Sequence, residues 1–215
     1  MSKSHKHKTY PIAEERINIA SHGLGLVLSI CALVILTIKA TGMLQVVSVS
    51  VFAASMIALY GSSTIYHSTT NVQRRAWLRT VDHAMIYVLI AGSYTPFALL
   101  ILKGALGWAI FGVSWAMAVT GIVIKLFHTG RYDKLSTAMY VFMGWVIVFA
   151  IKPLIASIAP EGLTLLFAGG VSYTVGALFY SISRMPFGHA TFHIFVLIGS
   201  ACHFVAVYRY VLTPS

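Results

Sequence analysis

Two histidines four residues apart, His189 and His193, are the clearest chemical signal in the sequence. They lie in the segment Gly188-His-Ala-Thr-Phe-His193, inside an apolar run. If this run is helical, the spacing corresponds to about 40° of rotation and about 6 Å of rise, so both imidazoles lie on one face. Helices use this spacing to bind a metal through two histidines. The pair indicates a metal site, although two histidines that only hydrogen-bond to neighbouring helices fit the spacing equally well.

Two other apolar runs carry polar side chains that need an explanation. Ser63 and His67 repeat the four-residue spacing, and Asp82 stands near the start of the next run. An ionisable group at the centre of a membrane helix costs on the order of 2.5–3.5 kcal/mol on insertion scales, so each one should have a partner. A serine in a membrane helix commonly bonds to its own backbone. For Asp82, an ion pair with Arg79, one turn earlier, is the structural alternative to a role in a site.

The composition shows that these runs belong in a membrane. Of the 215 residues, 58% are hydrophobic and only 9% are charged, whereas roughly a quarter are charged in a soluble domain. The net charge of +10 comes from basic residues that separate the apolar runs and form no continuous patch. It therefore predicts contacts with anionic membrane lipids and argues against nucleic acid. Cys31 and Cys202 lie in apolar runs and offer no disulfide framework.

Seven stretches approach or exceed the roughly 20 residues that a spanning helix needs. We expect an all-α integral membrane protein, folded as a seven-transmembrane helix bundle. Residues 1–16 should form a cytoplasmic basic tail and residues 17–211 the seven-helix transmembrane domain. The expected spans are about 17–38, 45–67, 80–101, 105–127, 136–157, 163–182 and 188–211.

The basic residues between the spans predict their direction. Eleven of the fifteen lysines and arginines fall on the side of the N-terminus and four on the other side. The richer side should face the cytoplasm, which places the N-terminus inside and the C-terminus outside. The four on the poorer side are Lys39, Lys103, Lys152 and Arg209.

This orientation brings four polar residues to one depth. His67 ends a span that runs inward, and Asp82 begins the next span, which runs outward. His189 and His193 occupy the first two turns of the last span, which also runs outward. All four are therefore expected near the cytoplasmic face.

At these residues the sequence resembles the PAQR family, the progestin and adipoQ receptors, and within it the bacterial hemolysin III branch. The matching motifs are the SxxxH of Ser63 to His67, Asp82 early in the third span, and the HxxxH of His189 to His193. The segment Glu14-Glu-Arg-Ile-Asn-Ile-Ala-Ser-His-Gly23 also resembles the start of bacterial members. The similarity runs from about residue 14 to 211.

The resemblance implies a zinc ion, Zn²⁺, held near the cytoplasmic face by His67, His189 and His193, with Asp82 and Ser63 beside a water on the metal. It also implies a protein of a bacterial cell inner membrane, and relatedness to suspected membrane hydrolases such as alkaline ceramidases. Three imidazoles leave one position of a tetrahedral zinc open, and Asp82 could serve as general base. We therefore expect a zinc-dependent hydrolase of membrane lipid amides or esters that contributes to membrane homeostasis.

Other functions remain open on the sequence alone. A structural zinc could brace the helices of a non-enzymatic sensor or regulator of membrane state. Haem binding would use the fourteen-residue separation of His189 and His203, but it needs an equivalent histidine pair on a facing span. Proton-coupled transport would use Asp82 and the histidines as a relay, yet most ionisable groups cluster near one face. We interpret His22, near the same depth as the predicted site, as a packing residue that forms a hydrogen bond.

Overall fold

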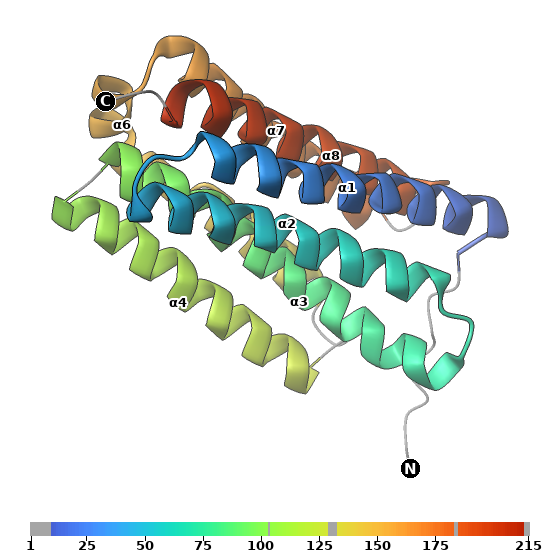
Figure 1. Cartoon of the computed structure of the whole chain (residues 1–215). Helices are drawn as coiled ribbons and strands as arrows, with labels where there is room; N and C mark the ends of the chain where they lie inside the picture. The colour runs from blue at the N-terminus through green and yellow to red at the C-terminus, as the bar shows by residue number, and fades with distance from the viewer. Residues whose placement is uncertain (1–9, 103, 129–132, 183–184, 213–215) are drawn as a thin grey trace.

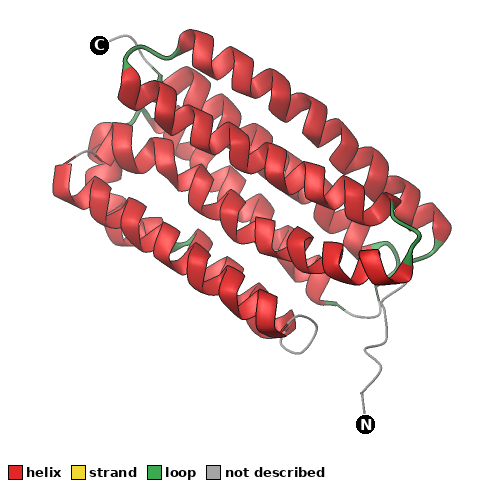
Figure 2. Cartoon of the chain, turned by 60° about the horizontal axis from the view of Figure 1, so that its bottom comes forward, coloured by secondary structure: helices red, strands yellow, loops and turns green. Residues whose placement is uncertain are grey.

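The computed structural model describes residues 10–102, 104–128, 133–182 and 185–212, which are helical almost throughout (Figure 2). Seven of its helical segments are long and apolar enough to cross a membrane. The predicted all-α, seven-transmembrane architecture is thus confirmed. The first nine residues of the predicted basic tail lie outside the described residues, as do Lys103, Arg131 and Arg184 of the charge count.

Four of the spans are single α-helices, and three change helix type along their length. The single helices are α1 (Ile12–Lys39), α2 (Met43–Ser68), α4 (Gly104–His128) and α7 (Pro160–Ser181). Two α-helices end in a π-helical turn, α3 (Val72–Pro96) in η1 (Phe97–Leu102) and α8 (Gly188–Ala206) in η3 (Val207–Val211). The fifth span joins α5 (Asp133–Gly144), the 3₁₀-helix η2 (Val146–Ala150) and α6 (Ile151–Ser157).

The long helices pack side by side, with α1 between α2 and α8 (Figure 1). On the other side of α2 lies α3, which also contacts α4, while α7 packs against α8. The start of α1, the end of α2 and the starts of α3 and α8 all lie at one end of the bundle (Figure 1). Residues far apart in the sequence therefore meet at this end.

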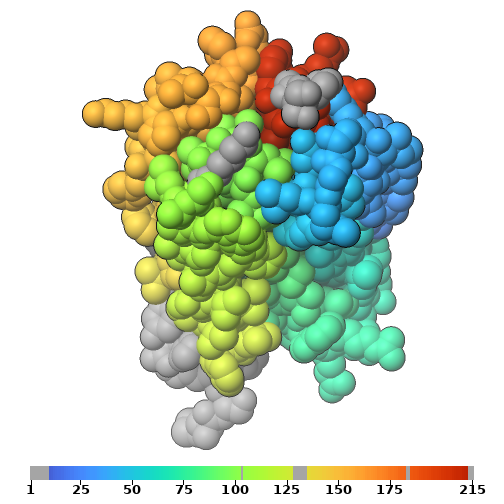
Figure 3. Space-filling view, turned by 60° about the vertical axis from the view of Figure 1, so that its left-hand side comes forward, coloured from blue at the N-terminus to red at the C-terminus, as the bar shows by residue number. Residues whose placement is uncertain are grey.

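Apolar side chains cover much of the outer surface of the bundle. On α4, which faces the viewer in green to yellow in Figure 3, Trp108, Val119 and Phe127 are exposed by 57%, 58% and 78%. In water, an apolar surface of this extent promotes association. In a bilayer it contacts lipid chains, and the helices satisfy their own backbone hydrogen bonds.

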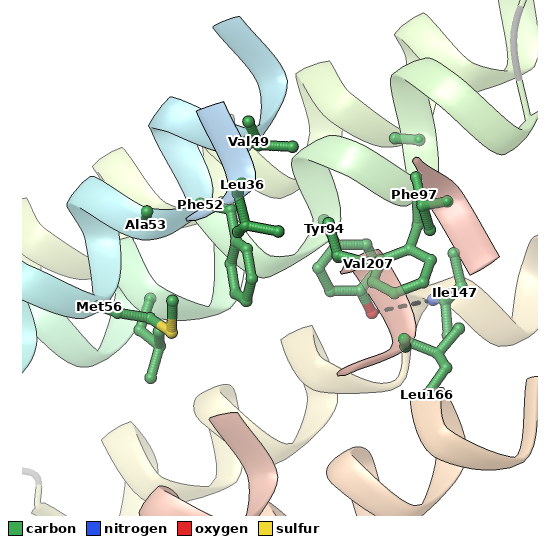
Figure 4. Packing of buried hydrophobic residues seen from close by; sticks show 14 of the residues in the cluster. Leu36, Val49, Phe52, Ala53, Met56, Tyr94, Phe97, Ile147, Leu166 and Val207 are labelled. Carbon is green, nitrogen blue, oxygen red and sulfur yellow. Dashed lines mark hydrogen bonds between the residues drawn. The ribbon is translucent and has the colours of Figure 1, made fainter. Parts of the chain in front are cut away.

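The break in the fifth span is closed by a side chain from α3. The hydroxyl of Tyr94 donates to the carbonyl of Gly144, 2.8 Å away, and accepts a hydrogen bond from the backbone N–H of Ile147 at 3.0 Å. Figure 4 shows the second bond as a dashed line, with Phe97 and Leu166 packed nearby. Without this hydroxyl, backbone groups at the break would lack partners in an apolar environment, which is costly.

Small residues allow α2 and α3 to approach closely. A Cβ atom added at Gly92 on α3 would lie 2.2 Å from Oγ of Ser55 on α2. That hydroxyl is itself held by a hydrogen bond to the carbonyl of Phe52, at 2.6 Å. Close contacts of this kind between small residues are a common basis of helix packing in membranes.

We predict that Gly92→Ala destabilises the protein by about 1–3 kcal/mol, because the added methyl group forces α2 and α3 apart. Gly112→Ala on α4 is the matched control, since no atom lies within 4 Å of a Cβ there. Thermal unfolding of both variants in detergent measures the effect. Equal melting temperatures for the two variants would refute the close contact.

Candidate metal centre

Three histidines from two helices meet at the end of the bundle where α1, α3 and α8 begin. His67 comes from the last turn of α2, and His189 and His193 come from the first two turns of α8. One ring nitrogen from each lies within 4.8 Å of the others. All three residues are buried, with exposures of 3%, 4% and 1%. The residues expected to bind a metal are thus brought together.

The geometry of this cluster fits a single metal ion. The Nε2 atoms of His67 and His189 are 3.1 Å apart, and two nitrogens that bind one tetrahedral zinc at about 2.0–2.1 Å are themselves about 3.3 Å apart. The third ring nitrogen, from His193, lies within 4.8 Å of the other two. Three imidazoles with one open position are the donor set of catalytic zinc sites. The cluster could therefore hold a metal.

A carboxylate on α1 orients His67. Its Nδ1 lies 2.6 Å from Oε2 of Glu15, and because an ionised carboxylate only accepts hydrogen bonds, Nδ1 carries the hydrogen. Nε2 of His67 then carries the lone pair, and it faces Nε2 of His189 at 3.1 Å. A carboxylate–histidine pair of this kind fixes the tautomer of a metal ligand and raises its basicity.

Arg75 on α3 holds the same carboxylate from the other side. Its guanidinium forms an ion pair with the second oxygen of Glu15. Nη1 of Arg75 also donates to the carbonyl oxygens of His67, at 3.4 Å, and Thr69, at 3.0 Å, where α2 ends. A residue that we counted only as a topology signal therefore connects the ends of α1, α2 and α3.

The neighbouring carboxylate, Glu14, caps the helix that carries the histidine pair. Its Oε1 accepts hydrogen bonds from the backbone N–H groups of His189, at 3.1 Å, and Ala190, at 3.4 Å. The first N–H groups of a helix have no partner within the helix, and a negative charge there also interacts favourably with the helix dipole. Glu14 thus fixes the start of α8.

The sequence did not reveal the roles of these two glutamates. The helix α1 begins at Ile12, so residues 12–16, which we assigned to the basic tail, are helical and carry Glu14 and Glu15. The chain has only five acidic residues, and two of them are adjacent at the start of an apolar run. That rarity, and their place in the segment that resembles the start of bacterial family members, were the signals that could have drawn attention to them.

Asp82 and Ser63 lie beside the histidine cluster. Asp82 is 5% exposed, and its charge interacts with both His67 and Arg79. Ser63 is fully buried and lies close to Asp82.

Aromatic rings enclose the cluster. The ring of His22 on α1 stacks on His193, with centroids 3.5 Å apart and an angle of 8°. His22 therefore packs against the cluster through its ring, and the hydrogen bond expected for it stays a prediction. Tyr10 stacks on His189 at 4.7 Å, and burial raises the pKa of its hydroxyl, which keeps it neutral.

An internal cavity extends from the cluster along α8. It is lined by Asp82, His189 and His193 at one end and by His203 at the other. His203 follows His189 by fourteen residues, a rise of about 21 Å along the helix. Its walls are mainly apolar. Its volume is about 110 Å³, and one water occupies about 10–15 Å³ of such a volume. His83 also lines it, although it is not one of the three clustered histidines.

We predict that Glu15→Gln weakens zinc binding about 10- to 100-fold, because a neutral amide orients the imidazole of His67 less firmly. A competing chelator gives the dissociation constant on purified protein. Glu161→Gln is the control: it makes the same change at an exposed residue in the first turn of α7 and should not alter the affinity. Equal affinities in the two variants would contradict the role of Glu15.

Comparison with known proteins finds relatives that cover most of the chain. The chain is 47% identical over 204 residues to "Hemolysin-3 homolog" of Bacillus subtilis (strain 168), covering 94% of this chain and 96% of that protein. It is 43% identical over 218 residues to "Hemolysin-3" of Bacillus cereus, covering the full length of both. The human "Monocyte to macrophage differentiation factor" is 29% identical over 168 residues, covering 74% of this chain and 68% of that protein.

No solved structure matches the chain. The family model described as "Haemolysin-III related" matches residues 10–204, which include every residue of the histidine cluster together with Glu14, Glu15, Ser63 and Asp82. With this match and its two bacterial relatives, the chain belongs to the haemolysin-III related family.

Proposed function

We propose that the protein is a zinc-dependent hydrolase that cleaves amides or esters of membrane lipids and contributes to membrane homeostasis. The observation that carries the proposal is the buried cluster of His67, His189 and His193 with Asp82 and Ser63 beside it. A purely structural metal site is usually closed by four protein ligands. Here the described residues offer three histidines and, next to them, a carboxylate suited to proton transfer.

Each polar residue has a defined part in this proposal. When bound, zinc supplies a Lewis acid that polarises the lipid carbonyl and lowers the pKa of a water. Asp82 accepts the proton of the attacking water as the new carbon–oxygen bond forms, and it returns that proton to the leaving nitrogen or oxygen as the old bond breaks. The hydroxyl of Ser63 donates a hydrogen bond to Asp82 or to the attacking water. It thereby holds this water in line with the carbonyl of the lipid.

The apolar cavity supports a lipid as the substrate. Between the cluster and His203 its walls include Leu59, Leu89 and Phe97, and apolar walls with a few polar groups at one end are typical of sites for amphiphilic ligands. The reacting carbonyl would lie at the histidines and the acyl chain would follow α8. Membrane lipids are therefore the partners that we propose for this protein.

We predict that Asp82→Asn retains one zinc per chain but lowers hydrolysis about 100- to 10,000-fold, because an amide cannot accept the proton. Elemental analysis measures the metal, and turnover of a panel of acyl amides and phospholipids measures the activity. Glu161→Gln serves as the control with full activity, and the double variant His189→Ala/His193→Ala should lose both metal and turnover.

Two results would count against hydrolysis. Full turnover by Asp82→Asn would remove the proposed base from the reaction. Stoichiometric zinc in a protein that cleaves no member of the panel would favour the alternative, a sensor or regulator of membrane state in which the metal braces α2 and α8.

We also propose that the N-terminus faces the cytoplasm of a bacterial inner membrane and the C-terminus faces outward. The proposal rests on the eleven-to-four division of basic residues. A fluorescent protein that folds only in the cytoplasm should fluoresce when it is fused before Met1 and should not fluoresce when it is fused after Ser215. The reverse pattern would overturn the orientation and place the metal centre at the opposite face.

A further inference from the structure

A second group of polar residues lies at the far end of the cavity, deep within the span. His203 is ten residues after His193 on α8, a rise of about 15 Å. It is 6% exposed, lines the cavity, and lies between the rings of Phe97 and Tyr173. The proposed hydrolysis makes no use of this residue.

The hydrogen bonding of His203 leaves one acceptor without a partner. Its Nε2 donates to the backbone carbonyl of Leu166 on α7, at 3.2 Å, so Nδ1 carries the lone pair. Within the described part of the chain, Nδ1 has no hydrogen-bond partner although it is buried. A buried acceptor in this state is unfavourable and calls for a donor from outside the chain.

The imidazole of His203 is held in this orientation by close packing. A Cβ atom at Gly169 would lie 2.3 Å from its Cδ2 atom, so the ring fills the space that a side chain on α7 would need. The bond to Leu166 fixes its other edge. The ring cannot turn to satisfy Nδ1 without breaking that bond.

Hydroxyl groups from α2, α7 and α8 lie near His203 and bond to one another. The hydroxyl of Tyr60 donates to Oγ of Ser200, at 2.7 Å, and the hydroxyl of Tyr173 lies 2.9 Å from the same atom. Tyr173 also lines the cavity and contacts His203 edge to face. A saturated hydrocarbon chain in the cavity would leave Nδ1 of His203 without a donor.

We propose that His203 and Tyr173 form a second binding subsite, which takes a hydroxyl group on the distal half of a lipid acyl chain. The hydroxyl donates to Nδ1 of His203, while the carboxyl-derived end of the lipid lies at the histidine cluster about 15 Å away. This inference rests on the proposed function, since it names the class of lipid that the cavity selects: acyl chains that carry a hydroxyl far from the reacting carbonyl.

Binding of free fatty acids to the purified protein in detergent tests the subsite without any turnover. The probes are stearic acid, a stearic acid hydroxylated in the distal half of its chain, and one hydroxylated next to the carboxylate, each displacing a fluorescent fatty acid. We expect the distally hydroxylated acid to bind about three- to tenfold more tightly than stearic acid, as a single neutral hydrogen bond allows. The proximally hydroxylated acid should show no such gain.

The variant His203→Phe keeps a ring of similar size and removes the acceptor. It should abolish the preference for the distally hydroxylated acid over stearic acid. If this variant does not fold, the three probes on the wild-type protein still decide the question. Equal binding of the distally hydroxylated and plain acids would overturn the subsite alone, whereas no binding of any probe would overturn both the subsite and the lipid substrate of the proposed function.

Discussion

Two adjacent carboxylates on α1 hold together the helices that carry the clustered histidines. Glu15 bonds to the imidazole of His67 at the end of α2, and Glu14 bonds to backbone N–H groups at the start of α8. A charge at this depth is costly unless it has a partner, so each carboxylate stabilises the arrangement that surrounds it. The end of α2 and the start of α8 are thereby placed relative to each other by residues of the chain itself.

This arrangement bears on how strongly an ion is held. Side chains that already face one point lose little conformational freedom when they bind an ion. The negative charge of Glu15 also makes the imidazole of His67 a stronger metal ligand. Arg75 balances that charge and also binds the carbonyl groups at the end of α2. The histidine cluster is therefore supported by α1 and α3 as well as by the two helices that provide its nitrogens.

The fold and the histidine cluster follow from features that a single sequence contains. Long apolar runs define membrane helices by length alone, and the alternation of the spans brings His67 and His189 to one depth. Asp82 was recognisable because a membrane segment tolerates few ionisable groups, whereas Ser63 was assigned to the site only through the family resemblance.

Other features could not be read from the sequence because their partners are distant in the chain. Glu15 bonds to a residue 52 positions away and Glu14 to one 175 positions away, and both glutamates follow a basic segment that resembles an exposed tail. The stacking of His22 on His193 depends on how α1 and α8 lie against each other. Periodicity within one helix gives no information about that relation.

The hydroxyl of Tyr94 links the wall of the cavity to a second helix. It occupies the interruption between α5 and η2, where it serves as donor to one backbone group and acceptor from another. The fifth span is thus interrupted at a point where a different helix pairs its backbone groups, and residues on both sides of the interruption border the cavity. The shape of this part of the cavity wall therefore depends on α3 as well as on the fifth span itself.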